Sequence, residues 1–180
     1  MHYRICPRCH CYINQHSGIR ELLKCACGFT RTERQMITIE QYLMGRDKLY
    51  PDQFNDQIKD NAIKIVDKVN ILLFRLSIRK AEVSSGWRPP TVNKITPNSA
   101  KVSKHMIACA VDLKDPDGVL AKQILINHNI LKQLGLFLED PRWTKGWVHI
   151  QNEPPASGNL IFIPSTTPQT NPDIWDGKLV

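Results

Sequence analysis

The sequence predicts an α+β domain preceded by a small cysteine-rich module. One long amphipathic helical pattern comes first, and short strand-like runs separated by turn residues follow it. Five of the six cysteines lie within the first fifth of the 180-residue chain. We therefore predict a module at 1–36, a main domain at 37–165 and an extended C-terminal tail at 166–180.

The longest predicted helix covers about residues 56–77. Its apolar residues recur at steps of three and four along the chain: Ile58, Ala62, Ile65, Val69, Leu72 and Leu76. This spacing places them on one helical face, which we interpret as the face that packs on the core. Ahead of it, Thr38 and Gln41 form a capping-box pattern that predicts a short helix ended by Gly45. Pro51 then begins the next element.

The rest of the main domain alternates between strand-like and helical patterns. We expect a helix from Val119 to about Gln133, ended by Gly135. The expected strands are Ala81–Ser85, Ala108–Leu113, Trp147–Gln151 and an edge strand at Ile161–Ile163.

Two cysteine pairs in the first module predict a structural zinc site of the zinc-ribbon type. The predicted ligands are Cys6, Cys9, Cys25 and Cys27. The second pair has one intervening residue where two are usual, which leaves the fourth ligand open among Cys27, Cys11, His10 and His16. Free thiols or a redox pair are the alternative. So short a module cannot fold on its own core, so we expect the metal to stabilise it.

The formal charge of +7 suits a polyanionic partner such as nucleic acid or a bacterial cell wall. The basic residues of the first module are not interleaved with exposed aromatic side chains as a nucleic-acid platform requires, which argues against nucleic acid. No apolar run approaches the roughly 20 residues of a membrane span, and no secretory signal is expected. We therefore expect synthesis in a cytosol, where clustered cysteines are metal ligands rather than disulfides.

Three residues of the main domain have the side chains of a catalytic zinc site: His105, Asp112 and His149. Such a site uses three protein ligands and keeps a fourth position open for water. The residue types alone also allow another interpretation, in which the two histidines are hydrogen-bonded core residues and Asp112 caps the end of a strand.

Three motifs around these residues occur in a specific order. They are Ser84–Pro90 (SSGWRPP), Ser103–Asp112 (SKHMIACAVD) and Gly146–Ile150 (GWVHI). Together they resemble the zinc D-alanyl-D-alanine carboxypeptidases and L-alanyl-D-glutamate endopeptidases of bacterial cell-wall peptides. The resemblance covers about residues 37–165 and is closest to the versions that bacteriophages encode. It implies the hedgehog-like fold, a small antiparallel sheet with flanking helices.

The resemblance implies that His105, Asp112 and His149 bind a catalytic zinc. It also implies that Arg88 faces the scissile carbonyl and the charge that develops on it. We expect Ser103 to bind substrate, while Trp147 either lines the substrate pocket or fills the core. Ala108 stands where the family motif commonly has glycine.

The family also needs a carboxylate that moves the proton of the attacking water. Gly146 stands where some members have this acid, three residues before the last histidine. The hedgehog-like arrangement places the acid at the end of the preceding strand, so we predict Glu139 as the catalytic carboxylate, with Asp140 as substitute. The alternative is that both belong to a solvated turn before Pro141.

The expected function is hydrolysis of a peptide bond in the stem or cross-link of peptidoglycan, with one catalytic and one structural zinc. The enzyme would serve a phage in lysis or entry, either in the virion tail or in the infected-host cytoplasm. Residues 1–36 would dock on tail or other virion proteins. The alternative is a catalytically silent virion structural or wall-binding protein on the same fold.

Overall fold

The computed structural model describes residues 3–5, 12–14, 36–97 and 99–163. The strands β1 (Tyr3–Ile5) and β2 (Tyr12–Asn14) pair antiparallel in a two-stranded sheet. The cysteines of the predicted zinc ribbon and the predicted C-terminal tail lie outside the described residues. The ribbon and its zinc therefore stay predictions.

The main part of the chain is an α+β fold with one five-stranded sheet, in the order β3-β4-β6-β5-β7. All neighbours pair antiparallel except β5 and β7, which are parallel. The expected edge strand thus forms as β7, at one side of the sheet. The strands are β3 (Val83–Ser85), β4 (Ala110–Asp115), β5 (Phe137–Glu139), β6 (Gly146–Gln151) and β7 (Ile161–Phe162).

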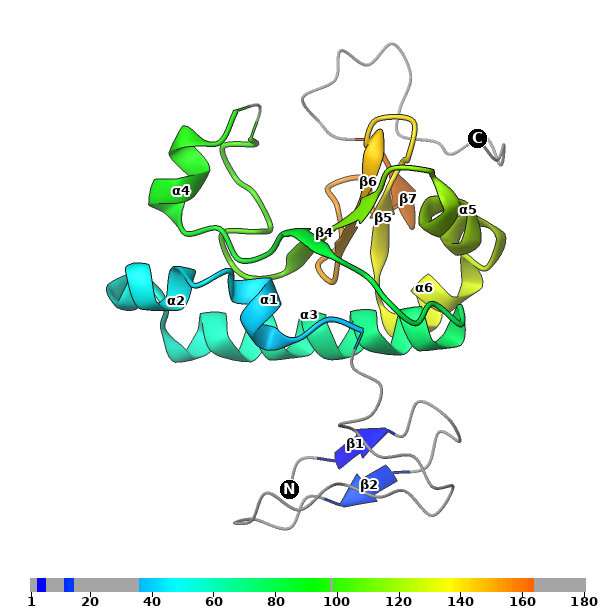
Figure 1. Ribbon diagram of the computed structural model, residues 1–180, viewed down its shortest axis with the longest axis horizontal. Coiled ribbons are helices and arrows are strands. Elements are labelled where there is room, and N and C mark those ends of the chain that lie inside the picture. The colour runs from blue at the N-terminus through cyan, green and yellow to red at the C-terminus, as the bar shows by residue number, and fades with distance from the viewer. Residues whose placement is uncertain (1–2, 6–11, 15–35, 98, 164–180) are drawn as a thin grey trace.

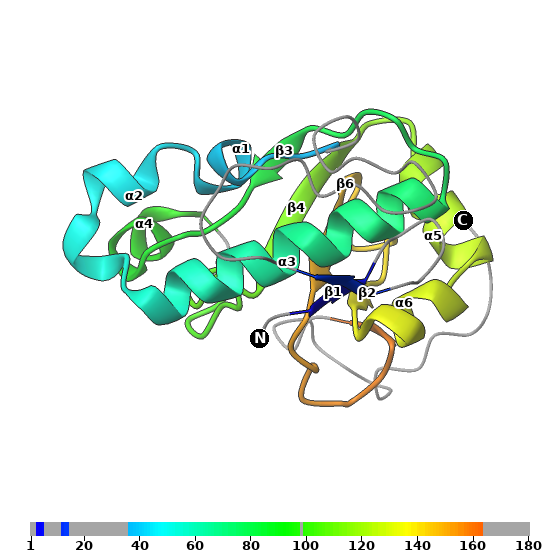
Figure 2. The same ribbon diagram turned by 90° about the horizontal axis from the view of Figure 1, so that it is seen from below.

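Helices flank this sheet, as the sequence predicted (Figure 1). The longest, α3, runs along one face of the sheet and crosses the whole domain when seen from below (Figure 2). Near one end of α3 lie α1, α2 and α4, and near the other end lie α5 and α6. Their bounds are α1 (Ile39–Leu43), α2 (Arg46–Leu49), α3 (Asp56–Arg75), α4 (Pro90–Ile95), α5 (Val119–Ile126) and α6 (Asn129–Leu134), with a 3-10 turn at Pro51–Gln53.

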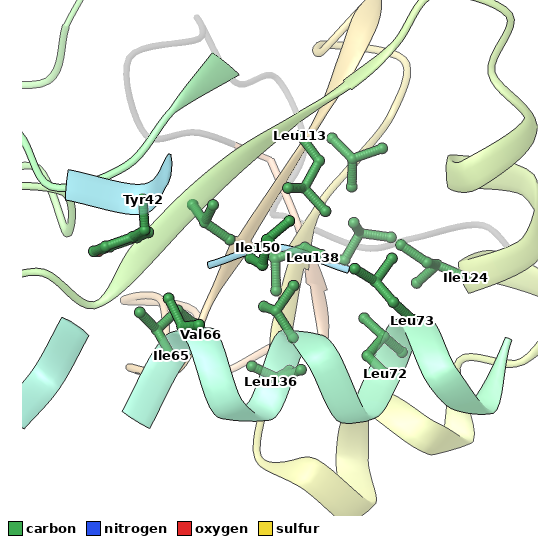
Figure 3. Close-up of a cluster of buried hydrophobic side chains, with 14 of the residues drawn as sticks. Tyr42, Ile65, Val66, Leu72, Leu73, Leu113, Ile124, Leu136, Leu138 and Ile150 are labelled. Atoms are coloured by element: carbon green, nitrogen blue, oxygen red, sulfur yellow. The ribbon is translucent and has the colours of Figure 1, made fainter. Parts of the chain in front are cut away.

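The core forms between α3 and the sheet, where the predicted stripe is buried along its whole length. Figure 3 shows Ile65 and Leu72 of α3 facing side chains of the sheet such as Leu113. The helix begins at Asn55, whose side chain accepts a hydrogen bond from the Ile58 amide at 3.0 Å. Burial of this apolar face stabilises α3 against the sheet. The opposite face of the sheet is not covered by α3.

The predicted capping box of α1 is present. The Thr38 hydroxyl accepts from the Gln41 amide at 3.2 Å, and the Gln41 side chain accepts from the Thr38 amide at 2.8 Å. The helix ends at Met44, which adopts a left-handed conformation, and Gly45 follows in the same conformation. The chain can therefore turn at Gly45, as the sequence indicated.

Three predicted boundaries are wrong. The strand expected over Ala81–Ser85 begins at Val83. The single helix expected over 119–133 is two helices, because the Asn127 side chain hydrogen-bonds the Gln123 carbonyl at 2.9 Å and the helix stops there. Gly135 ends the second helix in a left-handed conformation, as predicted. The strand expected from Ala108 begins at Ala110, because Ala108 has a positive φ of 55° that no strand accommodates.

Candidate metal centre

Asp112 and His149 face each other across the central strand pair. They are direct partners in the antiparallel register of β4 and β6. Their chain neighbours Leu113 and Ile150 belong to the core beneath the sheet. Because successive side chains of a strand point to opposite faces, Asp112 and His149 lie on the face away from α3.

His105 reaches the same point from the loop before β4. Its Nε2 lies 3.2 Å from Oδ1 of Asp112, and Nδ1 of His149 lies 2.7 Å from that same oxygen. All three side chains are buried, and their ligand atoms lie within 4.8 Å of one another. The structure thus brings together the three residues that the sequence predicted as ligands.

Burial and the contacts within the cluster set the pKa values of its three ionisable groups. Burial lowers the pKa of His105, although Asp112 opposes that effect. Burial alone would raise the pKa of Asp112, but the charges of the two histidines and their hydrogen bonds outweigh it and hold the pKa well below its usual range. For His149 burial is outweighed too, and the hydrogen bond to Asp112 raises its pKa. Asp112 is therefore ionised at neutral pH and offers a buried negative charge.

The cluster fits a zinc ion by the chemistry of its donors. Two imidazole nitrogens and one carboxylate oxygen are a common set of ligands for catalytic zinc, which leaves a fourth position open. The far nitrogen of each histidine also lies near an acceptor: Nδ1 of His105 is 2.8 Å from the Gly86 carbonyl, and Nε2 of His149 is 3.3 Å from Oε1 of Gln151. Such outer partners orient histidine ligands in metal sites. This is the one group of three or more such residues within the described ranges.

Arg88, which the resemblance places at the scissile carbonyl, lies beside the cluster. Its amide donates to the His105 carbonyl at 3.1 Å, and its Nη2 donates to the Ser103 hydroxyl at 3.3 Å. Its buried Nε has no hydrogen-bond partner, and no carboxylate of the described residues forms an ion pair with it. Burial lowers the pKa of Arg88 while the Asp112 charge opposes this. A cationic group whose Nε has no partner among the described residues therefore borders the candidate metal centre.

The turn that carries Arg88 is fixed by contacts with α1 and α2. The buried Trp87 donates from its amide to the Tyr42 carbonyl at 3.3 Å and from its indole to the Met106 carbonyl at 3.2 Å. Nη1 of Arg46 donates to the Trp87 carbonyl at 2.6 Å. These bonds hold the turn against the His105 loop, which positions Arg88.

Glu139 is the last residue of β5, the strand that pairs with β6. Leu138 pairs with Ile150, so Glu139 and His149 follow as the next residues of the two strands. Burial raises the pKa of Glu139, His149 opposes this, and the negative charges of Asp112 and Asp140 add to the rise. No hydrogen bond or ion pair to its carboxylate is present in the part of the chain that the structure describes.

Asp140, the predicted substitute, is used differently. Its carboxylate is buried and forms an ion pair with Arg142, with Oδ2 2.5 Å from Nη2. It also accepts a hydrogen bond from the Arg142 amide at 3.0 Å. These contacts stabilise the turn after β5, so the geometry favours Glu139 over Asp140 as a carboxylate that carries protons.

The two predicted substrate-binding residues also lie around the cluster. Ser103 is half-buried and contacts Arg88. Trp147 is half-buried, outside the core, with its ring 6.3 Å from the His149 ring. Sequence reasoning missed Phe162, whose ring packs 6.2 Å from that of His149, and missed Gln151. Gln151 follows His149 by two positions, so strand alternation places both side chains on the same face of the sheet. The sequence therefore contained a signal for Gln151.

Comparison with protein-family models, curated proteins and solved structures gives no match to this chain. Within the described residues, no helix is both long and apolar enough to cross a membrane.

Proposed function

We propose that this chain is a zinc-dependent peptidoglycan peptidase that hydrolyses a peptide bond of the stem or cross-link peptide. The observation that carries the proposal is the buried cluster of His105, Asp112 and His149, bordered by the Arg88 guanidinium, with which no carboxylate of the described residues pairs. The motifs that resemble the D-alanyl-D-alanine carboxypeptidases and L-alanyl-D-glutamate endopeptidases support the same conclusion. The hedgehog-like fold of that family belongs to this proposal, because the described structure establishes only an α+β fold.

The three cluster residues would hold the zinc. When bound, zinc supplies a Lewis acid that polarises a peptide carbonyl and makes water a better nucleophile at neutral pH. Arg88 would bind the substrate carbonyl oxygen through its guanidinium and stabilise negative charge there. Ser103 accepts a hydrogen bond from Arg88 and so orients the guanidinium toward the substrate.

Glu139 would act as the group that moves protons. Burial raises its pKa, so its carboxylate is a stronger base than an exposed glutamate and can take the proton of the attacking water. It would then give that proton to the departing amine. Its carboxylate has no hydrogen-bond partner in the part of the chain that the structure describes, in contrast to Asp140, and this supports the role.

The partners follow from the same proposal. Peptidoglycan is the substrate, and the net positive charge of the chain suits the anionic bacterial wall. Residues 1–36, with a structural zinc, would dock the enzyme on tail or other virion proteins. The protein would act from a phage virion or from the infected-host cytoplasm.

The deciding experiment measures new amino groups released from purified cell walls by the zinc-loaded protein. We expect release by wild type and none by His105→Ala or Asp112→Ala, while circular dichroism shows that both variants remain folded. His128→Ala, which changes a histidine of the α5–α6 junction, is the matched control and should keep full activity. Undiminished hydrolysis by His105→Ala would contradict the proposal.

A catalytically silent wall-binding or virion structural protein is the second candidate. It is favoured by Gly146, which stands where part of the family has the catalytic acid and begins β6 with φ 85°. This candidate predicts that zinc-loaded wild type sediments with purified walls but releases no amino groups from them. Release of amino groups by wild type would exclude it.

A further inference from the structure

Gln151 is the last residue of β6 and is buried beside His149. The register pairs it with Ala110 on β4 and with Phe137 on β5. A buried amide needs hydrogen-bond partners for both ends. Its Nε2 donates to the Glu153 carbonyl at 2.6 Å, and its Oε1 lies 3.3 Å from Nε2 of His149.

The contact with Glu153 decides which way the amide faces. A backbone carbonyl is only an acceptor, so the amide end that meets it must be the NH2 group. The amide oxygen of Gln151 therefore faces His149. That oxygen is also only an acceptor, so the hydrogen between Gln151 and His149 must lie on Nε2 of the imidazole.

The position of this hydrogen determines which nitrogen of His149 offers its lone pair. A histidine that binds a metal is neutral, and its single hydrogen lies on one nitrogen while the other offers its lone pair. With the hydrogen on Nε2, the lone pair of His149 is on Nδ1. Nδ1 is the nitrogen that lies 2.7 Å from Asp112 and faces the centre of the cluster.

His105 shows the same arrangement with the two nitrogens exchanged. Its Nδ1 lies 2.8 Å from the Gly86 carbonyl, so its hydrogen lies there and its Nε2 faces Asp112. Each histidine is thus oriented by one acceptor on its far side. The acceptor for His105 belongs to the backbone, whereas the acceptor for His149 is a side chain that a substitution can remove.

We propose that Gln151 is a positioning residue that holds the hydrogen of His149 on Nε2 and so makes Nδ1 the zinc ligand. This inference rests on the zinc site of the proposed function but is independent of its substrate. Outer partners of histidine ligands typically contribute about 10- to 100-fold to metal affinity. Gln151 does not touch the substrate or the metal in this role.

The test is the zinc dissociation constant, measured by competition with a chelator. His105→Ala, which lacks one ligand of the cluster, measures the zinc that is bound elsewhere in the chain. This amount is subtracted from the zinc binding of wild type and of each other variant. Gln151→Met, of similar size but without an acceptor, should bind zinc about 10- to 100-fold more weakly. Gln151→Glu keeps an acceptor for Nε2–H but loses the donor to Glu153, and it should bind zinc at least as tightly as wild type.

A second readout follows the hydrogen itself. In zinc-loaded protein labelled with nitrogen-15, NMR should show a protonated Nε2 and a metal-bound Nδ1 for His149. This Nε2–H signal should persist in Gln151→Glu and exchange faster with water in Gln151→Met. Asn70→Leu is the matched control, because it removes another amide that bonds to backbone, at Met36 and Ile37, far from the cluster in sequence.

The outcomes separate this inference from the proposed function. If wild type binds zinc at the cluster and Gln151→Met binds it within about twofold, the role of Gln151 is wrong while the zinc site stands. If Gln151→Met and Gln151→Glu are weakened equally, the Glu153 contact alone matters and the inference fails. If wild type binds no zinc at the cluster, the proposed function fails and the inference with it.

Discussion

The backbone of Gly86 lies so close to Tyr42 that a Cβ built on the glycine falls 1.8 Å from the Tyr42 carbonyl oxygen. On its other side, the Gly86 carbonyl lies 2.8 Å from Nδ1 of His105. The Tyr42 hydroxyl also donates to the Ala110 carbonyl at 3.0 Å, at the start of β4. Gly86 therefore contacts helix α1 on one side and the candidate metal centre on the other.

We predict that Gly86→Ala destabilises the protein by about 3 kcal/mol or more, because the new methyl group meets backbone that cannot move aside. Urea denaturation measures this loss. Ser84→Ala, two residues earlier on β3, is the matched control and should change the free energy of unfolding by less than about 1 kcal/mol. Similar effects of the two substitutions would show that the close approach to Tyr42 is not needed.

Glu139 should make the metal-free protein less stable as the pH rises. Burial raises its pKa in the folded state above the unfolded value, so the folded state holds this proton more tightly. The stability that this proton contributes is fully present below the unfolded pKa and is lost as the pH rises through the folded pKa. Glu139→Gln removes this dependence.

The measurement is the free energy of unfolding of wild type and Glu139→Gln, without metal, between acidic and neutral pH. The variant should be the more stable protein at neutral pH, and the difference should shrink as the pH falls below the pKa of an ordinary glutamate. Amino-group release from walls by the zinc-loaded variant should be strongly reduced. A difference in stability that grows toward acid would contradict the raised pKa.

Arg88 should matter for turnover and little for stability. Among the described residues its guanidinium has one hydrogen-bond partner, Ser103, so removal of the guanidinium loses few contacts of the fold. If Arg88 stabilises negative charge on the substrate, Arg88→Met lowers turnover of wall peptides by about 10²–10³. The free energy of unfolding should stay within about 1 kcal/mol of wild type.

Arg46 is the natural comparison for Arg88, because it donates to the Trp87 carbonyl at 2.6 Å. Arg46→Met removes a charged hydrogen bond to the turn and should cost about 1 kcal/mol of stability in this half-buried setting. Turnover should fall less than in Arg88→Met. The reverse order of the two effects would mean that Arg46, not Arg88, contacts the substrate.

Much of the fold was predictable from local patterns. The stripe of α3 repeats at helical spacing and all its residues are buried, because one face of a long helix must pack on a core. The capping box at Thr38 and the stop at Gly135 also formed as predicted, since each depends on neighbours within four residues. The break at Asn127 was missed, because an asparagine within a helical pattern does not by itself show that its side chain will bond to the preceding turn.

The candidate site was predictable in its residue types but not in its supporting contacts. His105, Asp112 and His149 were chosen from the sequence, and the structure brings them together. The close packing of Tyr42 on Gly86 joins residues far apart in the chain, and no pattern of spacing reports it. The choice between Glu139 and Asp140 likewise depended on the ion pair with Arg142, which the sequence left open.

Ala108 offers a test of backbone preference inside the site loop. Its φ of 55° is left-handed, which costs a non-glycine residue about 1–2 kcal/mol. Glycine, which the similar motifs commonly have there, avoids this cost but loses one buried methyl group. We expect Ala108→Gly to stay within about 0.5 kcal/mol of wild type, because the two effects oppose each other.

The matched control for Ala108→Gly is Ala110→Gly. Ala110 is equally buried but lies on β4, so glycine there loses the methyl group without relief of backbone strain. This control should cost about 1 kcal/mol or more in urea denaturation. If the two substitutions destabilise the protein equally, the left-handed conformation of Ala108 stores no strain.

Zinc stoichiometry tests the cluster and the predicted ribbon together. Wild type should contain about two zinc ions per chain, since two sets of ligands are expected. His105→Ala removes one of three protein ligands from a buried site and should leave about one ion, held by the cysteines of residues 1–36. Cys25→Ser should leave the other ion, at the cluster of His105, Asp112 and His149. Elemental analysis after dialysis gives these counts, and retention of the full wild-type zinc content by His105→Ala would contradict a metal site at the cluster.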